Sequence, residues 1–176
     1  MEDINVNPRV CYGYAQIEID SKIKELVIKE AITLELRIHV DNSPCVLEIL
    51  DTAGTEQFAS MRDLYIKNGH GFIVMYSLTN HQTFQDISNM KNVISRVKGS
   101  QPAPILLVAN KLDLECQREV TSVEGNALAE QWDCPFIEAS AKDRINVNEV
   151  FATVVREMNM TSEKRQKKSY CCCTLL

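Results

Sequence analysis

Hydrophobic and polar positions alternate most strictly between Thr33 and Val40, where every second side chain is apolar. A repeat of two residues is typical of a strand that buries one face only. The next four residues, Asp41-Asn42-Ser43-Pro44, have the composition of a turn. Another apolar-rich stretch follows at Val46–Leu50. The sequence therefore predicts a β-hairpin over this region.

Two later stretches, Gly71–Ser77 and Pro104–Ala109, are almost wholly apolar over the length of a strand, and Phe136–Ala139 is expected as a short strand. Continuous apolar runs indicate strands of a parallel sheet that is covered on both faces. Apolar residues recur at helical spacing in the segments between and after them, Thr83–Val97, Ser122–Trp132 and Asn146–Met158. Because strands and helices alternate, we expect an α/β fold with a doubly wound, mostly parallel sheet and flanking helices.

The pattern is less regular before Thr33 and after residue 160. Arg9–Ile19 can form a strand, and Asp20 can cap a helix that follows it. We therefore treat residues 1–32 as an atypical N-terminal segment and residues 33–160 as the main domain. Residues 161–176 are polar and basic, and we expect this tail to be disordered.

Charge is distributed unevenly along the 176 residues. The net charge is −5, although the tail alone carries +3. An acidic body argues against nucleic-acid binding, whereas a short basic tail favours an anionic membrane surface. The seven cysteines show no C-x-x-C spacing, which argues against zinc sites and a disulfide framework. We expect a protein of the reducing cytosol.

Polar motifs directly follow three of the predicted strands: Asp51-Thr52-Ala53-Gly54, Asn110-Lys111-Leu112-Asp113 and Ser140-Ala141-Lys142. Ligands of open α/β sheets bind at the carboxyl ends of the strands, so the three motifs are expected on one rim. Each motif alone is also an ordinary surface turn. Their order, each after its own apolar strand, is far more specific.

The second and third motifs suit a guanine base. The carboxylate of Asp113 can accept both the ring N–H and the exocyclic amino group of guanine, and adenine lacks that pair of donors. The stem of Lys111 can cover the purine, Asn110 can tie the loops together, and the backbone N–H of Ala141 can donate to the guanine carbonyl. In the first motif, Asp51 suits a Mg²⁺ ion through water, and the Gly54 N–H suits a terminal phosphate.

These motifs resemble those of Ras-like small GTPases. Asp51–Gly69 is similar to the second switch region of the Rap subgroup, and the motifs at Asn110 and Ser140 match the guanine-recognition motifs of the family. The resemblance covers roughly residues 33–176. It implies a monomeric signalling switch that binds GTP or GDP with Mg²⁺, hydrolyses GTP, and meets regulators or effectors through the surface around Phe58–Tyr65. Thr55 stands at the water-orienting position, where a threonine is characteristic of the slowly hydrolysing Rap proteins.

The phosphate-binding loop of that family, G-x-x-x-x-G-K-[ST], is absent. Gly13 is the only glycine before Gly54, and no Gly-Lys-Ser or Gly-Lys-Thr occurs in the chain. The first switch has no match either, since Lys29–Ile32 occupies its place. Five or six lost hydrogen bonds to phosphate oxygens, at about 1.5–3 kcal/mol each, amount to about 8 kcal/mol or more, which is roughly a million-fold in affinity. We expect weak, guanine-selective binding and negligible intrinsic hydrolysis.

The last four residues, Cys173-Thr174-Leu175-Leu176, fit a C-a-a-X prenylation box whose terminal leucine favours geranylgeranyl transfer to Cys173. Cys171 and Cys172 are candidates for palmitoylation. One lipid binds membranes only marginally, and the basic residues upstream supply a second signal. We expect a lipid-anchored protein on the cytoplasmic face of the plasma membrane or endomembranes.

Three functional hypotheses remain open at this point. The chain is a Rap-like GTPase that acts as a membrane-bound switch, or a prenylated pseudo-GTPase that binds partners without cycling nucleotide. Alternatively, it is the product of an alternative exon or a faulty gene model, because the resemblance stops abruptly near Thr33.

Overall fold

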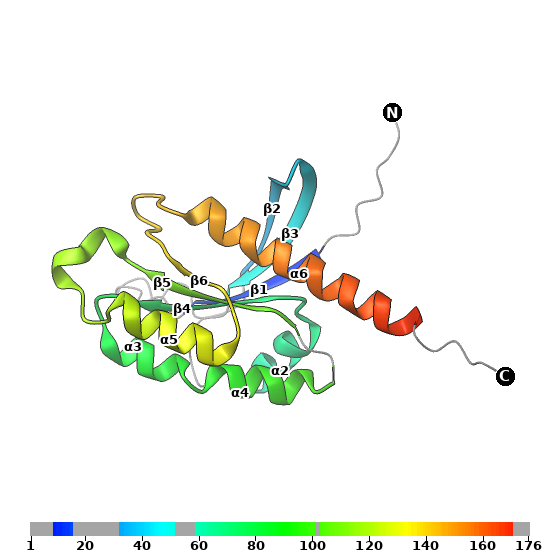
Figure 1. Ribbon diagram of the computed structural model, residues 1–176, viewed down its shortest axis with the longest axis horizontal. Coiled ribbons are helices and arrows are strands. Elements are labelled where there is room, and N and C mark those ends of the chain that lie inside the picture. Colours follow the sequence, from blue (N-terminus) through cyan, green and yellow to red (C-terminus); the bar gives the residue numbers. More distant parts are fainter. Residues whose placement is uncertain (1–8, 16–31, 52–58, 101–102, 171–176) are drawn as a thin grey trace.

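The computed structural model describes residues 9–15, 32–51, 59–100 and 103–170 (Figure 1). Its six strands are β1 (Arg9–Ala15), β2 (Ile32–Val40), β3 (Ser43–Asp51), β4 (Phe72–Ser77), β5 (Ile105–Asn110) and β6 (Phe136–Glu138). They form one sheet in the order β2-β3-β1-β4-β5-β6. Only the pairing of β2 with β3 is antiparallel among these contacts. The predicted doubly wound α/β fold is confirmed.

The predicted hairpin is present, with the turn reduced to two residues. Val40 pairs with Ser43, so Asp41 and Asn42 alone make the turn. Both have positive φ values, 50° and 64°, and such turns suit the right-handed twist of the flanking strands. Ser43 and Pro44, which we had placed in the turn, belong to β3. Pro44 is tolerated because it is the second residue of β3 and precedes Leu47, where the described pairing with β1 begins.

Strand β1 lies at the centre of the sheet, in parallel pairing with β3 on one side and β4 on the other. It covers Arg9–Ala15, within the stretch 9–19 that the sequence predicted as a strand. The N-terminal segment therefore supplies the strand around which the sheet order reverses. The helix that we expected after Asp20 lies outside the described residues.

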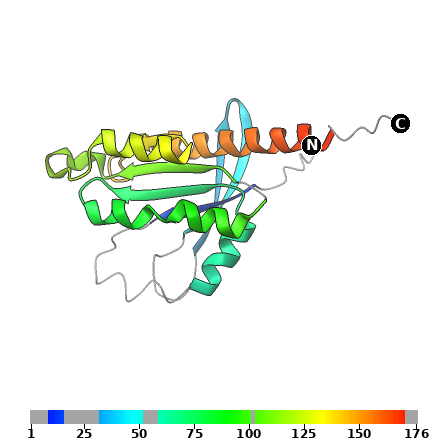
Figure 2. The same ribbon diagram turned by 60° about the horizontal axis from the view of Figure 1, so that its bottom comes forward.

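Helices cover both faces of the sheet (Figure 2). One hydrophobic cluster joins β4 and β5 to α2 (Ala59–Asn68), α3 (His81–Ile87), α4 (Met90–Lys98) and α5 (Ser122–Trp132). A second cluster joins β2, β3, β4 and β5 to α6 (Val147–Tyr170). Alternate residues of one strand serve the two clusters: Phe72 and Val74 face the first, and Ile73 faces the second. This explains why β4 reads as one apolar run.

The helix predicted over Thr83–Val97 is two helices, α3 and α4, separated at Ser88 and Asn89. The Ser88 hydroxyl donates to the Phe84 carbonyl at 3.3 Å. Its backbone N–H donates to Gln85, one residue short of the α-helical partner. Serine bonded back to the preceding turn bends helices, and the apolar stripe alone does not reveal such a bend.

The expectation of disorder from Thr161 is wrong up to Tyr170, because α6 continues to that residue and projects past the sheet (Figure 2). Residues 163–168 contain glutamate, lysine, arginine and glutamine without glycine or proline. These residues are good helix formers, and they extend a helix whose earlier turns are already packed. Within the described part of the chain, no helix is long and apolar enough to span a membrane.

Candidate functional site

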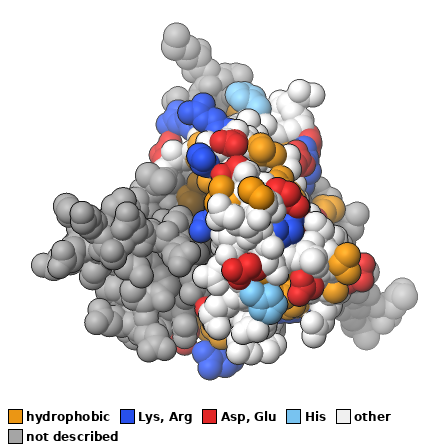
Figure 3. Space-filling view, turned by 90° about the vertical axis from the view of Figure 1, so that its left-hand side faces the viewer, with side chains coloured by type: hydrophobic (Ala, Val, Ile, Leu, Met, Phe, Trp, Pro, Cys, Tyr) orange, Lys and Arg blue, Asp and Glu red, His pale blue; other side chains and the backbone are white. Residues whose placement is uncertain are grey.

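The motifs that begin at Asn110 and Ser140 lie at neighbouring strand ends. Asn110 is the last residue of β5 and pairs beside Ser77 of β4, while β6 ends at Glu138, two residues before Ser140. Figure 3 views this end of the molecule, where charged side chains of both signs surround scattered hydrophobic ones. Ile145, which is 40 % exposed, forms a β-bridge with Ser140 in the loop after β6.

Asn110 ties the two loops together, as the sequence predicted. Its side-chain oxygen accepts the backbone N–H of Lys111 at 2.8 Å and that of Ala141 at 3.1 Å. Its backbone carbonyl accepts the N–H of Leu78 at 2.9 Å. One residue therefore connects β5, the loop after β4 and the loop after β6.

Lys111 turns the chain sharply at the end of β5. Its backbone has φ 70° and ψ 35°, a left-handed conformation that is uncommon outside glycine. The chain then enters the 3₁₀ helix η2 (Leu112–Gln117), and the N–H of Leu112 donates to the carbonyl of Ala139 at 3.1 Å. This turn brings Asp113 next to Ser140.

The carboxylate of Asp113 is held from two sides. The Ser140 hydroxyl donates to Oδ1 at 2.6 Å, and Lys142 Nζ lies 3.8 Å from Oδ2. Ser140 is fully buried and also accepts the N–H of Asp143 at 3.0 Å, so its hydroxyl is fixed in direction. The hydrogen bond from Ser140 lowers the pKa of Asp113 below its ordinary value, and Lys142 and Lys111 lower it further. The site therefore presents an ionised carboxylate at neutral pH.

This arrangement fits a flat base with two adjacent donors. A carboxylate has about four acceptor directions, and Ser140 and Lys142 occupy one each. The Asp113 side chain is 7 % exposed, but the Lys142 side chain beside it is 76 % exposed and can move at little cost. The Ala141 N–H already donates to Asn110, so a guanine carbonyl would have to share or replace that bond.

Other predicted site residues are described in part or not at all. Asp51 ends β3 opposite Ile32 of β2 and Gly13 of β1, which puts its backbone at the rim beside the central strand. Gly54, Thr55 and the three cysteines at 171–173 lie outside the described residues. Among the residues that the structure describes, no group of three His, Cys, Asp or Glu side chains could hold a metal ion.

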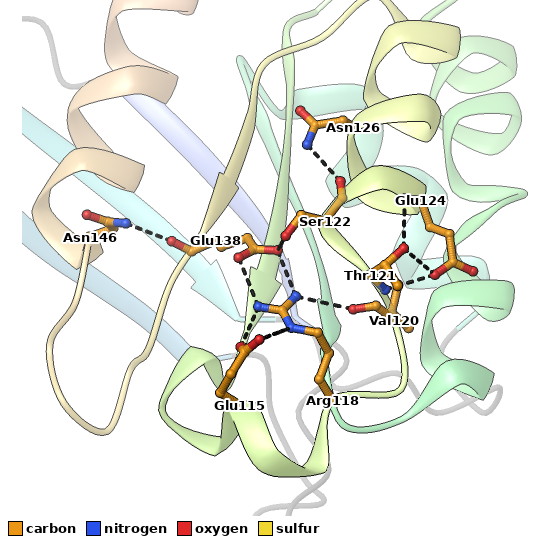
Figure 4. A network of polar contacts seen from close by, with 9 residues as sticks. All are labelled: Glu115, Arg118, Val120, Thr121, Ser122, Glu124, Asn126, Glu138 and Asn146. Carbon is orange, nitrogen blue, oxygen red and sulfur yellow. Dashed lines mark hydrogen bonds and ion pairs between the residues drawn. The ribbon is translucent and has the colours of Figure 1, made fainter.

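Sequence reasoning missed a network beside the site that centres on Arg118 (Figure 4). Its guanidinium donates to the carboxylates of Glu115 and Glu138 and to the carbonyl of Val120. Ser122 donates to Glu138 at 2.7 Å, and Thr121 and Glu124 form a capping box at the start of α5. A signal was available: Glu138 is the one charge in an otherwise apolar strand.

A protein-family model described as the Ras family matches residues 14–160, which is more than four-fifths of the chain. The chain belongs to the Ras family. The match begins at Tyr14, nineteen residues before Thr33, where the resemblance in motifs begins, and so includes the end of β1. Ras-family domains are small GTP-binding proteins, and guanine nucleotide with Mg²⁺ is their general ligand.

Proposed function

We propose that this Ras-family protein is Rap-like and recognises guanine through the β5 and β6 loops, with little contribution from phosphate. The observation that carries the proposal is the cross-linked pair of loops, in which Ser140 fixes Asp113 and Asn110 fixes Ala141. These contacts hold the ionised Asp113 carboxylate in an orientation that can accept both donors of the guanine edge. The absence of a Gly-Lys-Ser/Thr loop from the sequence argues for a weak site.

Titration calorimetry with guanosine, GDP, GTP and adenosine tests this proposal directly. Base contacts alone predict that guanosine, GDP and GTP bind with affinities within about threefold of one another, because a phosphate cradle would add roughly a million-fold. Adenosine should bind no better than background. Nanomolar, Mg²⁺-dependent GDP binding would show that this chain forms a phosphate site after all.

A second candidate function, a pseudo-GTPase that works as a binding module, is favoured by the same missing motif. Phosphoryl transfer depends on the positioning and charge stabilisation that the phosphate loop supplies. Without that loop, partners would bind the second-switch surface around Phe58–Tyr65 irrespective of nucleotide. Pull-down of a fixed partner panel with guanosine, GDP, GTP or no nucleotide separates the two functions, since a switch would show selectivity and a module would not.

We further propose geranylgeranylation at Cys173, palmitoylation at Cys171 or Cys172, and residence on a cytoplasmic membrane face. The support is the terminal box and the four basic residues at 164–168, each worth about 1 kcal/mol near an anionic surface. Cys173→Ser should move the protein to the soluble fraction, whereas neutralising the four basic residues should only redistribute it. A Cys173→Ser protein that stays on membranes would place the anchor elsewhere.

A further inference from the structure

Arg118 connects the two segments that carry the candidate guanine-binding residues. Its Nε lies 2.9 Å from both Glu115 carboxylate oxygens, and its Nη2 donates to Glu115 Oε2 at 2.6 Å. Its Nη1 and Nη2 donate to Glu138 at 2.8 and 3.1 Å. Glu115 belongs to η2, which begins one residue before Asp113, and Glu138 ends β6, two residues before Ser140. The arginine therefore bridges the same two segments as the Ser140–Asp113 hydrogen bond.

The Glu138 side of the bridge is shielded from water and has its own supports, whereas the Glu115 side chain is 66 % exposed. Only 15 % of the Arg118 side chain and 19 % of the Glu138 side chain are exposed. Ser122 donates to the Glu138 carboxylate, and Asn146 donates to the Glu138 backbone carbonyl at 2.8 Å. The hydrogen bond from Arg118 lowers the pKa of Glu138, which keeps this carboxylate ionised. A planar guanidinium between two carboxylates fixes direction as well as distance.

We propose that Arg118 is a positioning residue for guanine recognition, which holds η2 against β6 so that Asp113 and Ser140 keep their mutual orientation. The inference rests on the proposed function, since it concerns the same site. Arg118 is not placed against the base itself. It acts through Glu138 and Glu115 on the two loops, and its loss should disturb the alignment of the Asp113 carboxylate more than the fold.

Comparison of guanosine with inosine tests the alignment. Inosine lacks the exocyclic amino group, so it can use only one of the two Asp113 contacts. Wild type should prefer guanosine by about tenfold, the value of one hydrogen bond to a charged acceptor. Arg118→Ala should reduce this preference by about threefold or more. Arg118→Lys should restore little of it, because lysine keeps the charge but lacks the planar guanidinium that bonds both carboxylates. A merely structural role would weaken both ligands equally and leave the ratio unchanged.

Amide hydrogen exchange tests the positioning without any nucleotide. The N–H groups of Ala141 and Asp143 donate to Asn110 and Ser140 in the loops concerned. In Arg118→Ala and in the milder Glu138→Gln, both amides should exchange at least about fivefold faster than in wild type, because the loops open more often. Arg156→Ala is the matched control: Arg156 also bridges two carboxylates, Asp41 and Glu149, but these belong to the β2–β3 turn and to α6 and not to η2 or β6.

The outcomes separate the two proposals. If wild type does not prefer guanosine to adenosine, guanine recognition fails, and the exchange rates still decide whether Arg118 positions the loops. If the Arg118 variants exchange at the wild-type rate at Ala141 and Asp143, or if Arg156→Ala accelerates them equally, the positioning role is overturned. A changed exchange rate with an unchanged guanosine-to-inosine ratio also overturns it, because the arginine would then serve the fold alone.

Discussion

The chain has several residues suited to bind the base of a nucleotide and lacks the motif that would bind its phosphates. On the base side, at the ends of β5 and β6, Asn110, Asp113 and Ser140 are bonded to one another or to the opposite loop. On the phosphate side, β1 occupies its central place between β3 and β4, but the sequence after it has no Gly-Lys-Ser or Gly-Lys-Thr. The fold and the ligand site are therefore separable: a strand can keep the sheet intact while the residues after it lose their chemistry.

The largest effect should come from the base side. In Asp113→Asn an amide replaces the carboxylate that accepts both guanine donors. The amide oxygen can still accept one of them, but the amide NH₂ group then faces the other donor and cannot bond it. Guanosine affinity should fall about 100-fold and its preference over adenosine should vanish, as measured by calorimetry. Asp143→Asn is the control, because the recorded contact of Asp143 uses its backbone N–H. Equal losses in both variants would mean that loop charge in general, and not Asp113, binds the base.

A change in acid stability should follow from Ser140→Ala. The pKa of Asp113 is lowered in the folded state, so its contribution to stability is present above the unfolded pKa of about 3.9 and is lost as pH falls through the folded value. Without the Ser140 hydroxyl the folded pKa rises, and acid unfolding should begin at a higher pH. Fluorescence of Trp132, the only tryptophan, follows the transition.

The matched control for that titration is Thr153→Ala, whose hydroxyl donates to the exposed Glu149 at 3.1 Å. This variant should leave the acid midpoint where it is, because an exposed carboxylate gains little from one hydroxyl. A Ser140→Ala protein that loses stability equally at every pH would show that the hydroxyl serves the Asp143 N–H alone.

A smaller effect, in the opposite direction, is expected in the core beneath the base side. Tyr76 is 1 % exposed, and its hydroxyl has no hydrogen-bond partner within the described part of the protein. Its ring stacks edge-on against Phe84 with centroids 4.9 Å apart, so the ring itself is well packed. Tyr76→Phe should therefore raise the free energy of unfolding by about 1 kcal/mol, as measured by urea denaturation. A loss of stability would reveal a partner for the hydroxyl.

Gly125 leaves the space that the Tyr76 hydroxyl occupies. A Cβ at position 125 would lie 2.6 Å from the Tyr76 hydroxyl and would clash with the ring of Phe136. The glycine allows α5 to approach β4 and β6 closely, and this approach closes the space around the hydroxyl. Gly125→Ala, unlike Tyr76→Phe, should destabilise the protein in the same urea experiment, since neither neighbour is free to move far in a close-packed core.

No effect at all is expected from one change on the phosphate side. Thr55→Gln places the side chain that orients water in most Ras relatives, but the charge-stabilising groups would still be missing. Phosphate release from GTP should stay at background in both proteins. A clear rise in the variant would contradict the view that the phosphate side is inactive.

Much of the fold could be predicted from the sequence because the sheet is buried on both faces. The runs at Gly71–Ser77 and Pro104–Ala109 admit one interpretation, and β4 and β5 follow them within one residue. The alternation after Thr33 likewise fixes the hairpin register, as a slip by one residue would expose every apolar side chain. The break between α3 and α4 at Ser88 could not be predicted, because it depends on the hydrogen bond from the Ser88 hydroxyl to the backbone, which hydrophobic periodicity does not report.

The candidate site residues that belong to short sequence motifs could be predicted. Contacts between side chains that are distant in the sequence could not. Asn110, Asp113 and Ser140 came from short motifs placed after strands. Arg118 and Glu138 are twenty residues apart, and their pairing requires the end of η2 to lie beside the end of β6. Only the three-dimensional structure shows that these two ends are close together. The reach of the domain into residues 14–32 could not be predicted, because this stretch carries none of the family's motifs.

The central position of β1 also sets the order in which the chain can assemble. Tyr12 pairs with Phe72, sixty residues later, whereas the β2–β3 hairpin closes across only Asp41 and Asn42. At a synthesis rate of about 5–20 residues per second, β1 leaves the ribosome about 3–12 seconds before β4 is complete. A hairpin forms in about 1–10 microseconds, so β2 and β3 should be joined long before β1 gains its second neighbour. During that interval the edge of β1 that β4 later covers is open to chaperones and to unrelated strands.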